Sequence, residues 1–196
     1  MAQEIRTFIA IELPDLLKAR LSELQEGLKK QTPPRAVRWV SPEGIHLTLK
    51  FLGQTSVDRI EPIAKALTLA CAPFSPFTCV AGGLGCFPNL RRPRVIWVAV
   101  EEPTGTISEL QGAIERACSE LGFKGERRAF HPHLTLGRLR DWASAQERRA
   151  VGELIQRTEV PSLGVVAAKV ISLIRSDLRP TGAVYTTLRE IELKEG

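Results

Sequence analysis

Two of the three histidines in this 196-residue chain, His46 and His133, begin the same tetrapeptide. Residues 46–49 and 133–136 both read His-Leu-Thr-Leu. A single His-x-Thr sequence is commonplace in strands and carries little weight alone. An identical second copy is different, because the two copies together contain two of only three histidines. This repeat favours a functional role over packing and suggests that the chain has two related halves.

Strand geometry gives each tetrapeptide one polar face and one apolar face. Successive side chains of a strand point to opposite sides, so His46 and Thr48 share a face, as do His133 and Thr135. The two leucines of each copy share the other face, where full burial stabilises the fold by roughly 1.5–3 kcal/mol for each side chain. We therefore expect the leucines to anchor both strands while the imidazoles and hydroxyls meet across a cleft.

A cleft with two imidazoles suits the hydrolysis of a cyclic phosphodiester, with no metal or other cofactor. The attacking water must lose a proton and the departing sugar oxygen must gain one. Because the ordinary pKa of histidine is near 6.5, one ring can be charged while the other is neutral, and each such transfer is worth about 10²–10⁴ in rate. Thr48 and Thr135 are expected to donate hydrogen bonds to the non-bridging phosphate oxygens.

The third histidine permits a metal-dependent alternative. His131 and His133 would share a strand face, as in some zinc sites, and His46 would supply a third ligand. Pro132 complicates this arrangement, and no carboxylate beside the motif is evident that would orient the ligands. A zinc-dependent hydrolase is therefore a minor alternative, and His131 is expected to be a surface or partly buried side chain.

Hydrophobic patterns predict strands and helices in an uneven order. Helices are indicated where apolar residues recur every three or four positions, and strands where short apolar and β-branched runs occur. The predicted strands are 5–11, 37–40, 45–52, 77–81, 95–100, 133–139, 165–174 and 183–193, and the predicted helices are 14–30, 57–67, 106–121 and 144–157. Since 176–182 is long enough for a hairpin, part of the sheet should be antiparallel, which favours an α+β fold.

Several local signals set the expected boundaries of these elements. Gly53 is predicted to stop the strand that carries the first tetrapeptide. Thr106 and Ser144 each precede a glutamate by three residues, a capping-box pattern that predicts two helix starts. Segment 82–94 is rich in Gly, Pro and Arg and is predicted to be a long loop, a feature that is often functional.

Composition and charge are those of a globular protein that tolerates anionic partners. Apolar residues make up 43% of the chain, and Lys and Arg outnumber Asp and Glu by 27 to 22. The four cysteines form no C-x-x-C pair, so they are expected to be small buried hydrophobes. With neither a run of ~20 apolar residues nor signal-peptide features, and with no linker, the chain is expected to be one cytoplasmic domain, residues 1–196, without membrane contact.

The motif regions resemble a known family. Residues 46–53 (HLTLKFLG) and 132–138 (PHLTLGR) are closely similar to the paired motifs of the two-histidine (2H) phosphoesterases, and within them to the prokaryotic RNA 2′,3′-cyclic phosphodiesterases, also called 2′-5′ RNA ligases. The similarity extends to 8–14 and to segments within 176–185. It implies a bilobal fold with pseudo-twofold symmetry, in which two mainly antiparallel sheets face a central groove and helices lie outside.

The resemblance also implies a role for each motif residue. By similarity, His46 is the proton donor to the leaving 3′ oxygen, and His133 is the proton acceptor that activates water, so that a 2′-phosphate remains. Thr48 and Thr135 would hold the phosphate. The residues alone do not order the two histidines, so this assignment is carried by the resemblance.

Two charged residues beside the motifs are candidate substrate-binding residues. Lys50 follows His46 by four positions and shares its face under strict alternation, where it would add positive charge to the groove or lie solvated at the strand end. Arg138 matches an arginine of the family's second motif. Strict alternation nevertheless places Arg138 on the leucine face, away from His133.

Aromatic rings and further arginines could contact RNA. Phe8, Trp39 or Phe87 could stack on a terminal base, since such stacking tolerates any sequence, although each ring is also a candidate for the core. Arginines in two loop segments could contact phosphates or simply be solvated. These are Arg91, Arg92, Arg94, Arg127 and Arg128.

Functions from different classes remain open at this point. The leading hypothesis is a monomeric hydrolase of 2′,3′-cyclic RNA ends or small cyclic nucleotides, with weak reverse 2′-5′ ligation. The alternative is an RNA- or nucleotide-binding module that keeps the groove without turnover, which the excess of positive charge motivates. Two intact motif copies argue against that alternative.

Overall fold

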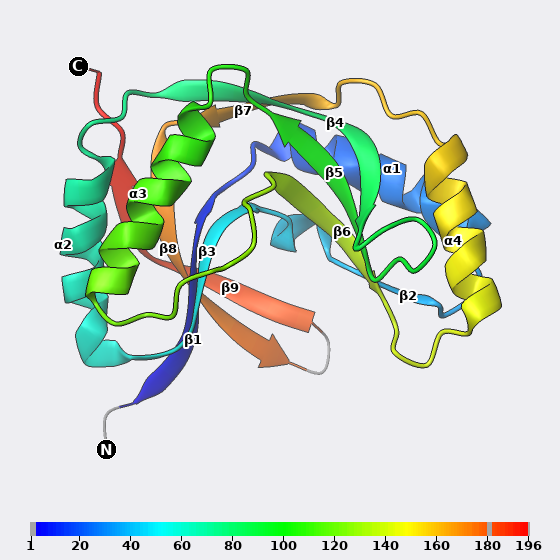
Figure 1. Cartoon of the computed structure of the whole chain (residues 1–196), viewed down its shortest axis with the longest axis horizontal. Helices are drawn as coiled ribbons and strands as arrows, with labels where there is room; N and C mark the ends of the chain where they lie inside the picture. The colour runs from blue at the N-terminus through cyan, green and yellow to red at the C-terminus, as the bar shows by residue number, and fades with distance from the viewer. Residues whose placement is uncertain (1–2, 180–181, 196) are drawn as a thin grey trace.

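The computed structural model describes residues 3–179 and 182–195, and in these ranges it contains nine strands and four α-helices (Figure 1). The strands are β1 (Glu4–Ile11), β2 (Val37–Trp39), β3 (Leu47–Ser56), β4 (Phe77–Phe87), β5 (Val95–Glu101), β6 (His133–Leu139), β7 (Gly164–Ala168), β8 (Val170–Arg179) and β9 (Gly182–Glu192). The helices are α1 (Asp15–Gln31), α2 (Ile60–Cys71), α3 (Thr106–Glu120) and α4 (Ala145–Arg157). The α+β prediction is confirmed.

All paired strands are antiparallel and join one continuous sheet. Its order is β7-β4-β5-β6-β3-β1-β8-β9, and β2 pairs with β6 off this path. The two middle strands, β3 and β6, carry the tetrapeptides and pair at Leu47 and Leu134. These leucines hold the same place in the two copies, so a pseudo-twofold axis passes between them. The two predicted sheets are therefore the two halves of one sheet, joined at this pair.

Both halves of the chain contribute to each half of the sheet. Strand β4 precedes β5 and pairs with it, whereas β8, from the end of the chain, pairs with β1. The helices are exchanged in the same way, because α1 contacts β7 and α3 contacts β3. Figure 1 shows α2 and α3 side by side at one end of the molecule, with α1 and α4 at the other. The exchange ties the motif strands to helices from both halves.

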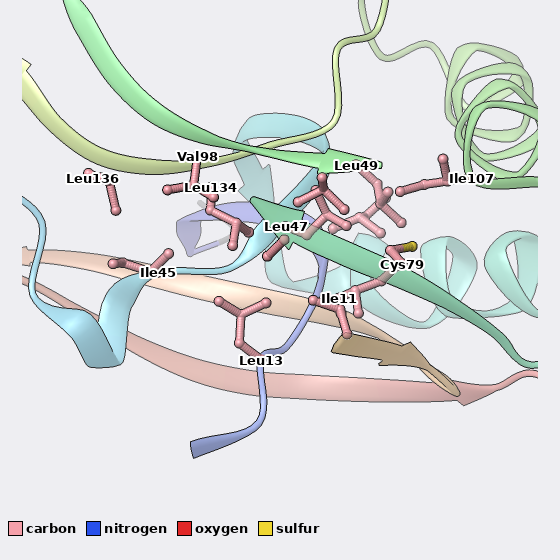
Figure 2. Close-up of a cluster of buried hydrophobic side chains, with 14 of the residues drawn as sticks. Ile11, Leu13, Ile45, Leu47, Leu49, Cys79, Val98, Ile107, Leu134 and Leu136 are labelled. Carbon is pink, nitrogen blue, oxygen red and sulfur yellow. The ribbon is translucent and has the colours of Figure 1, made fainter. Parts of the chain in front are cut away.

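The leucines of both tetrapeptides lie in the main hydrophobic core. Leu47, Leu134 and Leu136 have no exposed surface, and Leu49 is nearly as deeply buried. Figure 2 shows them among Ile11, Cys79 and Val98 of other strands, Ile107 of α3, and Ile45 of the segment before β3. The predicted anchoring of the motif strands by their leucine faces is confirmed.

The helices bury the predicted apolar faces, but only one predicted cap is present. Helix α4 begins with a capping box, in which the Ser144 hydroxyl accepts from the Glu147 N–H and the Glu147 carboxylate accepts from the Ser144 N–H. Helix α3 starts differently, because Gly105 is its N-cap residue and Glu102 accepts from the Ile107 N–H. The capping box predicted at Thr106 is wrong, since a carboxylate just before the helix takes that place.

Two predicted strand ends are wrong, and in both cases glycines are the reason. Strand β3 continues past Gly53, whose φ of 77° lies beside a register shift in the pairing with β1, so this glycine permits a bulge instead of a stop. Strand β4 runs through its glycines to Phe87, which pairs with Val95, and the predicted loop shortens to 88–94. The predicted run 165–174 divides into β7 and β8, which pair with different strands.

Within residues 3–179 and 182–195, no helix combines the length and the apolar character that crossing a membrane requires.

Candidate active site

The contact between β3 and β6 brings the two His-x-Thr pairs together crosswise. The strands are antiparallel, and Leu47 faces Leu134. One position to either side, His46 is therefore opposite Thr135 and Thr48 is opposite His133, all on the face away from the leucines. Facing Cα atoms in such a pair are about 4.5–5.5 Å apart. The four side chains are half-buried, so both imidazoles and both hydroxyls line one small area of the sheet.

Both motif strands contain a β-bulge at the last residue of the tetrapeptide. In β3 the extra residue is Leu49, which has no partner in the register with β1. In β6 it is Leu136, which has no partner in the register with β5. An extra residue moves the side chains that follow it to the opposite face of the sheet. The symmetric bulges thus reverse the faces that strict alternation predicts beyond each tetrapeptide.

The bulge in β3 overturns the prediction for Lys50. This side chain is on the core side, where Lys50 is 5% exposed and its Nζ donates to Glu115 Oε1 of α3 at 2.6 Å and to the Lys124 carbonyl at 3.1 Å. Lys50 therefore joins β3 to α3 and to the segment that leads to the second motif. The prediction that it lines the groove on the face of His46 is wrong.

The bulge in β6 has the reverse effect on Arg138. Its exposed side chain lies on the face that carries Thr135, not on the leucine face. Burial lowers the pKa of His133, and the charge of Arg138 contributes to that lowering. The face predicted by strict alternation is wrong, and the substrate-binding role that the resemblance implies for Arg138 stays a prediction.

A glutamine from each of two helices donates to a bulge carbonyl. Gln25 of α1 is fully buried, and its Nε2 donates to the carbonyls of Leu136 and Val40, both at 2.8 Å. Gln111 of α3 donates to the carbonyl of Leu49 at 3.4 Å. Both glutamines thus fix the backbone directly after a His-x-Thr pair. Helical periodicity does not reveal them, because a glutamine on an amphipathic helix is usually solvated.

His46 lies in an aromatic and largely desolvated environment. Its ring stacks on Phe8 with centroids 4.5 Å apart and an interplanar angle of 21°, and it meets Tyr185 edge-on at 5.2 Å. Gly44 permits this approach, since a Cβ there would lie 2.9 Å from the Tyr185 ring. Burial lowers the pKa of His46 to about 4, while the Glu12 carboxylate and a hydrogen bond to the Gly44 backbone oppose that lowering.

His133 has different neighbours and a defined hydrogen-bond partner. Its Nδ1 lies 2.6 Å from the carbonyl oxygen of His131, so in the neutral ring Nδ1–H donates there and Nε2 carries the free lone pair. Phe87 meets the ring edge-on at 5.0 Å, and Trp97 lies 6.2 Å away. Burial lowers the pKa of His133, the hydrogen bond to His131 opposes this, and the charge of Arg138 lowers it further.

The three histidines do not form a ligand set in this geometry. Within residues 3–179 and 182–195, no group of three or more His, Cys, Asp or Glu side chains is placed to hold a metal ion. His131 is exposed and its ring lies 6.2 Å from Phe87, so its link to the site is the backbone carbonyl that orients His133. The zinc alternative requires His46, His131 and His133 to converge, which they do not.

Phe8 lies in the core, as the alternative to base stacking predicted, and a neighbouring exposed ring was not predicted. Phe8 is 2% exposed and its face is occupied by His46. Phe51 lies 6.0 Å from Phe8, is 59% exposed, and is turned to this face by the bulge in β3. It stands five positions after His46, as Arg138 stands five positions after His133. That shared position in the repeat is the signal that could have identified Phe51.

The remaining candidates from the sequence surround this area. Phe87 is half-buried against His133, whereas Trp39 packs against the core. The arginines of the segments 91–94 and 127–128 are all exposed, and their contacts with RNA stay predictions.

Comparison with protein families accounts for the repeat. The family model described as LigT like phosphoesterase matches the chain twice, over residues 11–97 and 98–185. The chain therefore belongs to this phosphoesterase family. Each match contains one tetrapeptide, so the internal repeat extends from four residues to whole halves.

Individual relatives are similar over almost the entire length. The RNA 2′,3′-cyclic phosphodiesterase of Methanothermobacter thermautotrophicus is 33% identical over 190 residues, covering 97% of this chain and 100% of the relative. The RNA 2′,3′-cyclic phosphodiesterase of Thermotoga maritima is 33% identical over 192 residues, covering 98% of this chain and 97% of the relative. The crystal structure of TT0787 of Thermus thermophilus matches with a TM-score of 0.75 at 31% identity, covering 96% and 98% of the two chains. That of E. coli LigT complexed with 3′-AMP matches with a TM-score of 0.72 at 27% identity, covering 98% and 100%.

Proposed function

We propose that this chain hydrolyses 2′,3′-cyclic phosphate ends of RNA to 2′-phosphates, with His46 as proton donor and His133 as proton acceptor. The observation that carries the proposal is the pairing of Leu47 with Leu134, which sets one His-x-Thr pair from each half of the chain on the same face. Relatives named RNA 2′,3′-cyclic phosphodiesterase, similar over nearly the whole chain, support this substrate class.

The reaction needs two proton transfers at one phosphorus atom. Water attacks phosphorus and gives its proton to Nε2 of His133, while the bond from phosphorus to the 3′ oxygen breaks and that oxygen takes a proton from His46. Thr48 and Thr135 donate hydrogen bonds to the non-bridging oxygens, where negative charge increases in the transition state. The product is a 2′-phosphate with a free 3′ hydroxyl. Exchange of protons with solvent then returns His46 to its protonated form and His133 to its neutral form.

The hydrogen bonds around the rings support this division of labour. Because Nδ1–H of His133 donates to the His131 carbonyl, its Nε2 is free to accept a proton. His46 must carry a proton before reaction, yet burial lowers its pKa to about 4 in the free protein. An anionic phosphodiester beside the ring favours the charged form, as Glu12 already does. Substrate binding therefore raises the pKa of His46 and favours its protonation before reaction.

The architecture also bears on the organisation of the protein. One sheet continues through both halves of the chain, which supports a single domain over residues 1–196. Because both histidines come from one chain, the proposed reaction requires no second copy, and we propose that a monomer is the active form.

The proposal is tested with a short RNA that ends in a 2′,3′-cyclic phosphate, in excess EDTA, with the position of the product phosphate determined by NMR. We expect a 2′-phosphate from the wild type and almost none from His46→Ala or His133→Ala. Persistent turnover in both variants would eliminate the two-histidine mechanism. Tight binding of the RNA without any product would instead favour the non-catalytic binding module.

A further inference from the structure

Two arginines face each other across the strand pair that borders the second motif. Arg38 of β2 is directly opposite Arg138 of β6, and both side chains are exposed. Like charges directly opposite one another in an antiparallel pair destabilise the sheet. Among the described residues, no carboxylate lies within ion-pair distance of either guanidinium, so their repulsion is not relieved within the protein.

Arg6 and Tyr185 complete a cluster with this pair. Arg6 shares a face of β1 with Phe8, and it too has no ion-pair partner among the described residues. Burial raises the pKa of Tyr185, and the charges of Arg6, Arg138 and Arg38 each oppose that rise. Partial burial lowers the pKa of the Arg138 guanidinium, the charges of Arg38 and Arg6 lower it further, and Tyr185 opposes this lowering. Arginines from three strands, β1, β2 and β6, thus place positive charge near the hydroxyl of Tyr185 in β9.

The cluster adjoins the histidine site but is displaced from it. Tyr185 meets the His46 ring edge-on at 5.2 Å, so the cluster reaches the first imidazole through this ring. Arg138 follows Thr135 by three residues, a distance of no more than roughly 10 Å along a strand. The phosphates of neighbouring nucleotides in a strand of RNA can bridge such a separation.

We propose that Arg6, Arg38 and Arg138, with the hydroxyl of Tyr185, form a second phosphate-binding site that holds the phosphodiester preceding the cyclic end of an RNA strand. The inference rests on the proposed function and refines it, because it assigns protein contacts to the phosphodiester before the cyclic end, a group that a single nucleoside cyclic phosphate lacks. Guanidinium groups match the tetrahedral oxygens of a phosphate in a two-pronged geometry, and they are less strongly hydrated than ammonium groups. A bound phosphodiester supplies the negative charge that the protein itself does not place there.

The test compares two dinucleotides that differ only in the charge of the internal linkage. Both are ApA with a 2′,3′-cyclic end, one with a natural phosphodiester and the other with a neutral methylphosphonate. The measured quantity is the ratio of kcat/KM for the charged substrate to that for the neutral one, in the wild type and in Arg6→Gln/Arg38→Gln. The matched control, Arg149→Gln/Arg157→Gln, removes two arginine charges from α4.

We expect a ratio of about ten in the wild type and in the control, and a ratio near one in Arg6→Gln/Arg38→Gln, since a hydrogen bond to a charged group contributes on this scale. Each ratio comes from a single protein preparation, so partial misfolding of a variant cancels. A wild-type ratio near one, or an unchanged ratio in Arg6→Gln/Arg38→Gln, would overturn the inference. In that event, turnover of either substrate would leave the proposed function standing, whereas no turnover of both substrates by the wild type would remove the proposed function as well.

Discussion

The two copies of the motif share their backbone and differ in their surroundings. Each copy has a bulge at its last leucine and a helix glutamine that donates to the bulge carbonyl. His46 is enclosed by Phe8 and Tyr185, whereas His133 lies beside Phe87 and Arg138. The duplicated backbone therefore sets where the imidazoles lie, and the side chains that are not duplicated set how readily each imidazole holds a proton.

A second contrast appears five positions after each histidine. The first copy has Phe51 there and the second has Arg138, and both residues reach the site face because of the bulges. One side of the site therefore offers an exposed ring and the other a positive charge. An asymmetric ligand such as a nucleotide, with a base at one end and phosphates at the other, fits this difference.

The largest effect is expected from removing either motif imidazole. His46→Ala and His133→Ala should each lower kcat/KM by about 10²–10⁴, and the double variant should be little worse, because the two rings act as a unit. Steady-state rates on a cyclic-ended RNA measure this. His131→Ala is the control and should stay within about threefold of the wild type, since its contribution is a carbonyl that alanine retains. A loss in His131→Ala equal to that of the motif variants would contradict the equivalence of the two copies.

Stability against pH should distinguish the two rings. The folded state lowers the pKa of His46 from 6.5 to about 4, so the unfolded chain binds a proton at a pH where the folded chain does not. The stabilisation is complete above pH 6.5 and is lost as the pH falls toward 4, by up to about 3 kcal/mol. Urea unfolding between pH 7 and 4 should therefore give a flatter profile for His46→Phe. His133→Phe should flatten the profile less, and equal profiles for both variants would show that the two environments do not differ as described.

The two bulge glutamines should contribute unequally. Gln25→Leu leaves the buried Leu136 carbonyl without this donor and removes a second bond to Val40, so the free energy of unfolding should fall by about 1–3 kcal/mol. Gln111→Leu removes one longer bond from a partly buried residue and should cost less than about 1 kcal/mol. Chemical denaturation of both variants measures the difference. An equal loss would mean that the two halves hold their bulges equally strongly.

The smallest effect is expected at the exposed ring of the first copy. Phe51→Leu keeps an apolar contact with Phe8 but removes a stacking surface, so KM for a cyclic-ended RNA should rise about threefold with little change in kcat. A matched change at another exposed ring, Trp142→Leu, should leave KM unaltered. If KM rises equally in both variants, Phe51 has no specific contact with the base.

The sequence predicts the strands, the helices, the repeat and the leucine faces well, because each depends on a local period of two or of 3.6 residues. It fails for Lys50 and Arg138 for one shared reason. Each prediction extends strict alternation across a leucine that proves to be an extra residue, and a shift of one residue reverses the face of everything beyond it. The bulges depend on Gln25 and Gln111 from distant helices, which no local pattern specifies.

The central claim is that His46 protonates the leaving 3′ oxygen while His133 activates water, and a change of leaving group tests it most directly. The substrate is a 2′,3′-cyclic end in which sulfur replaces the 3′ bridging oxygen, because a thiolate leaves without being protonated. The account predicts that His46→Ala regains most of the wild-type rate on this substrate while His133→Ala stays impaired. Equal impairment of both variants on the sulfur substrate, or rescue of His133→Ala alone, would contradict it.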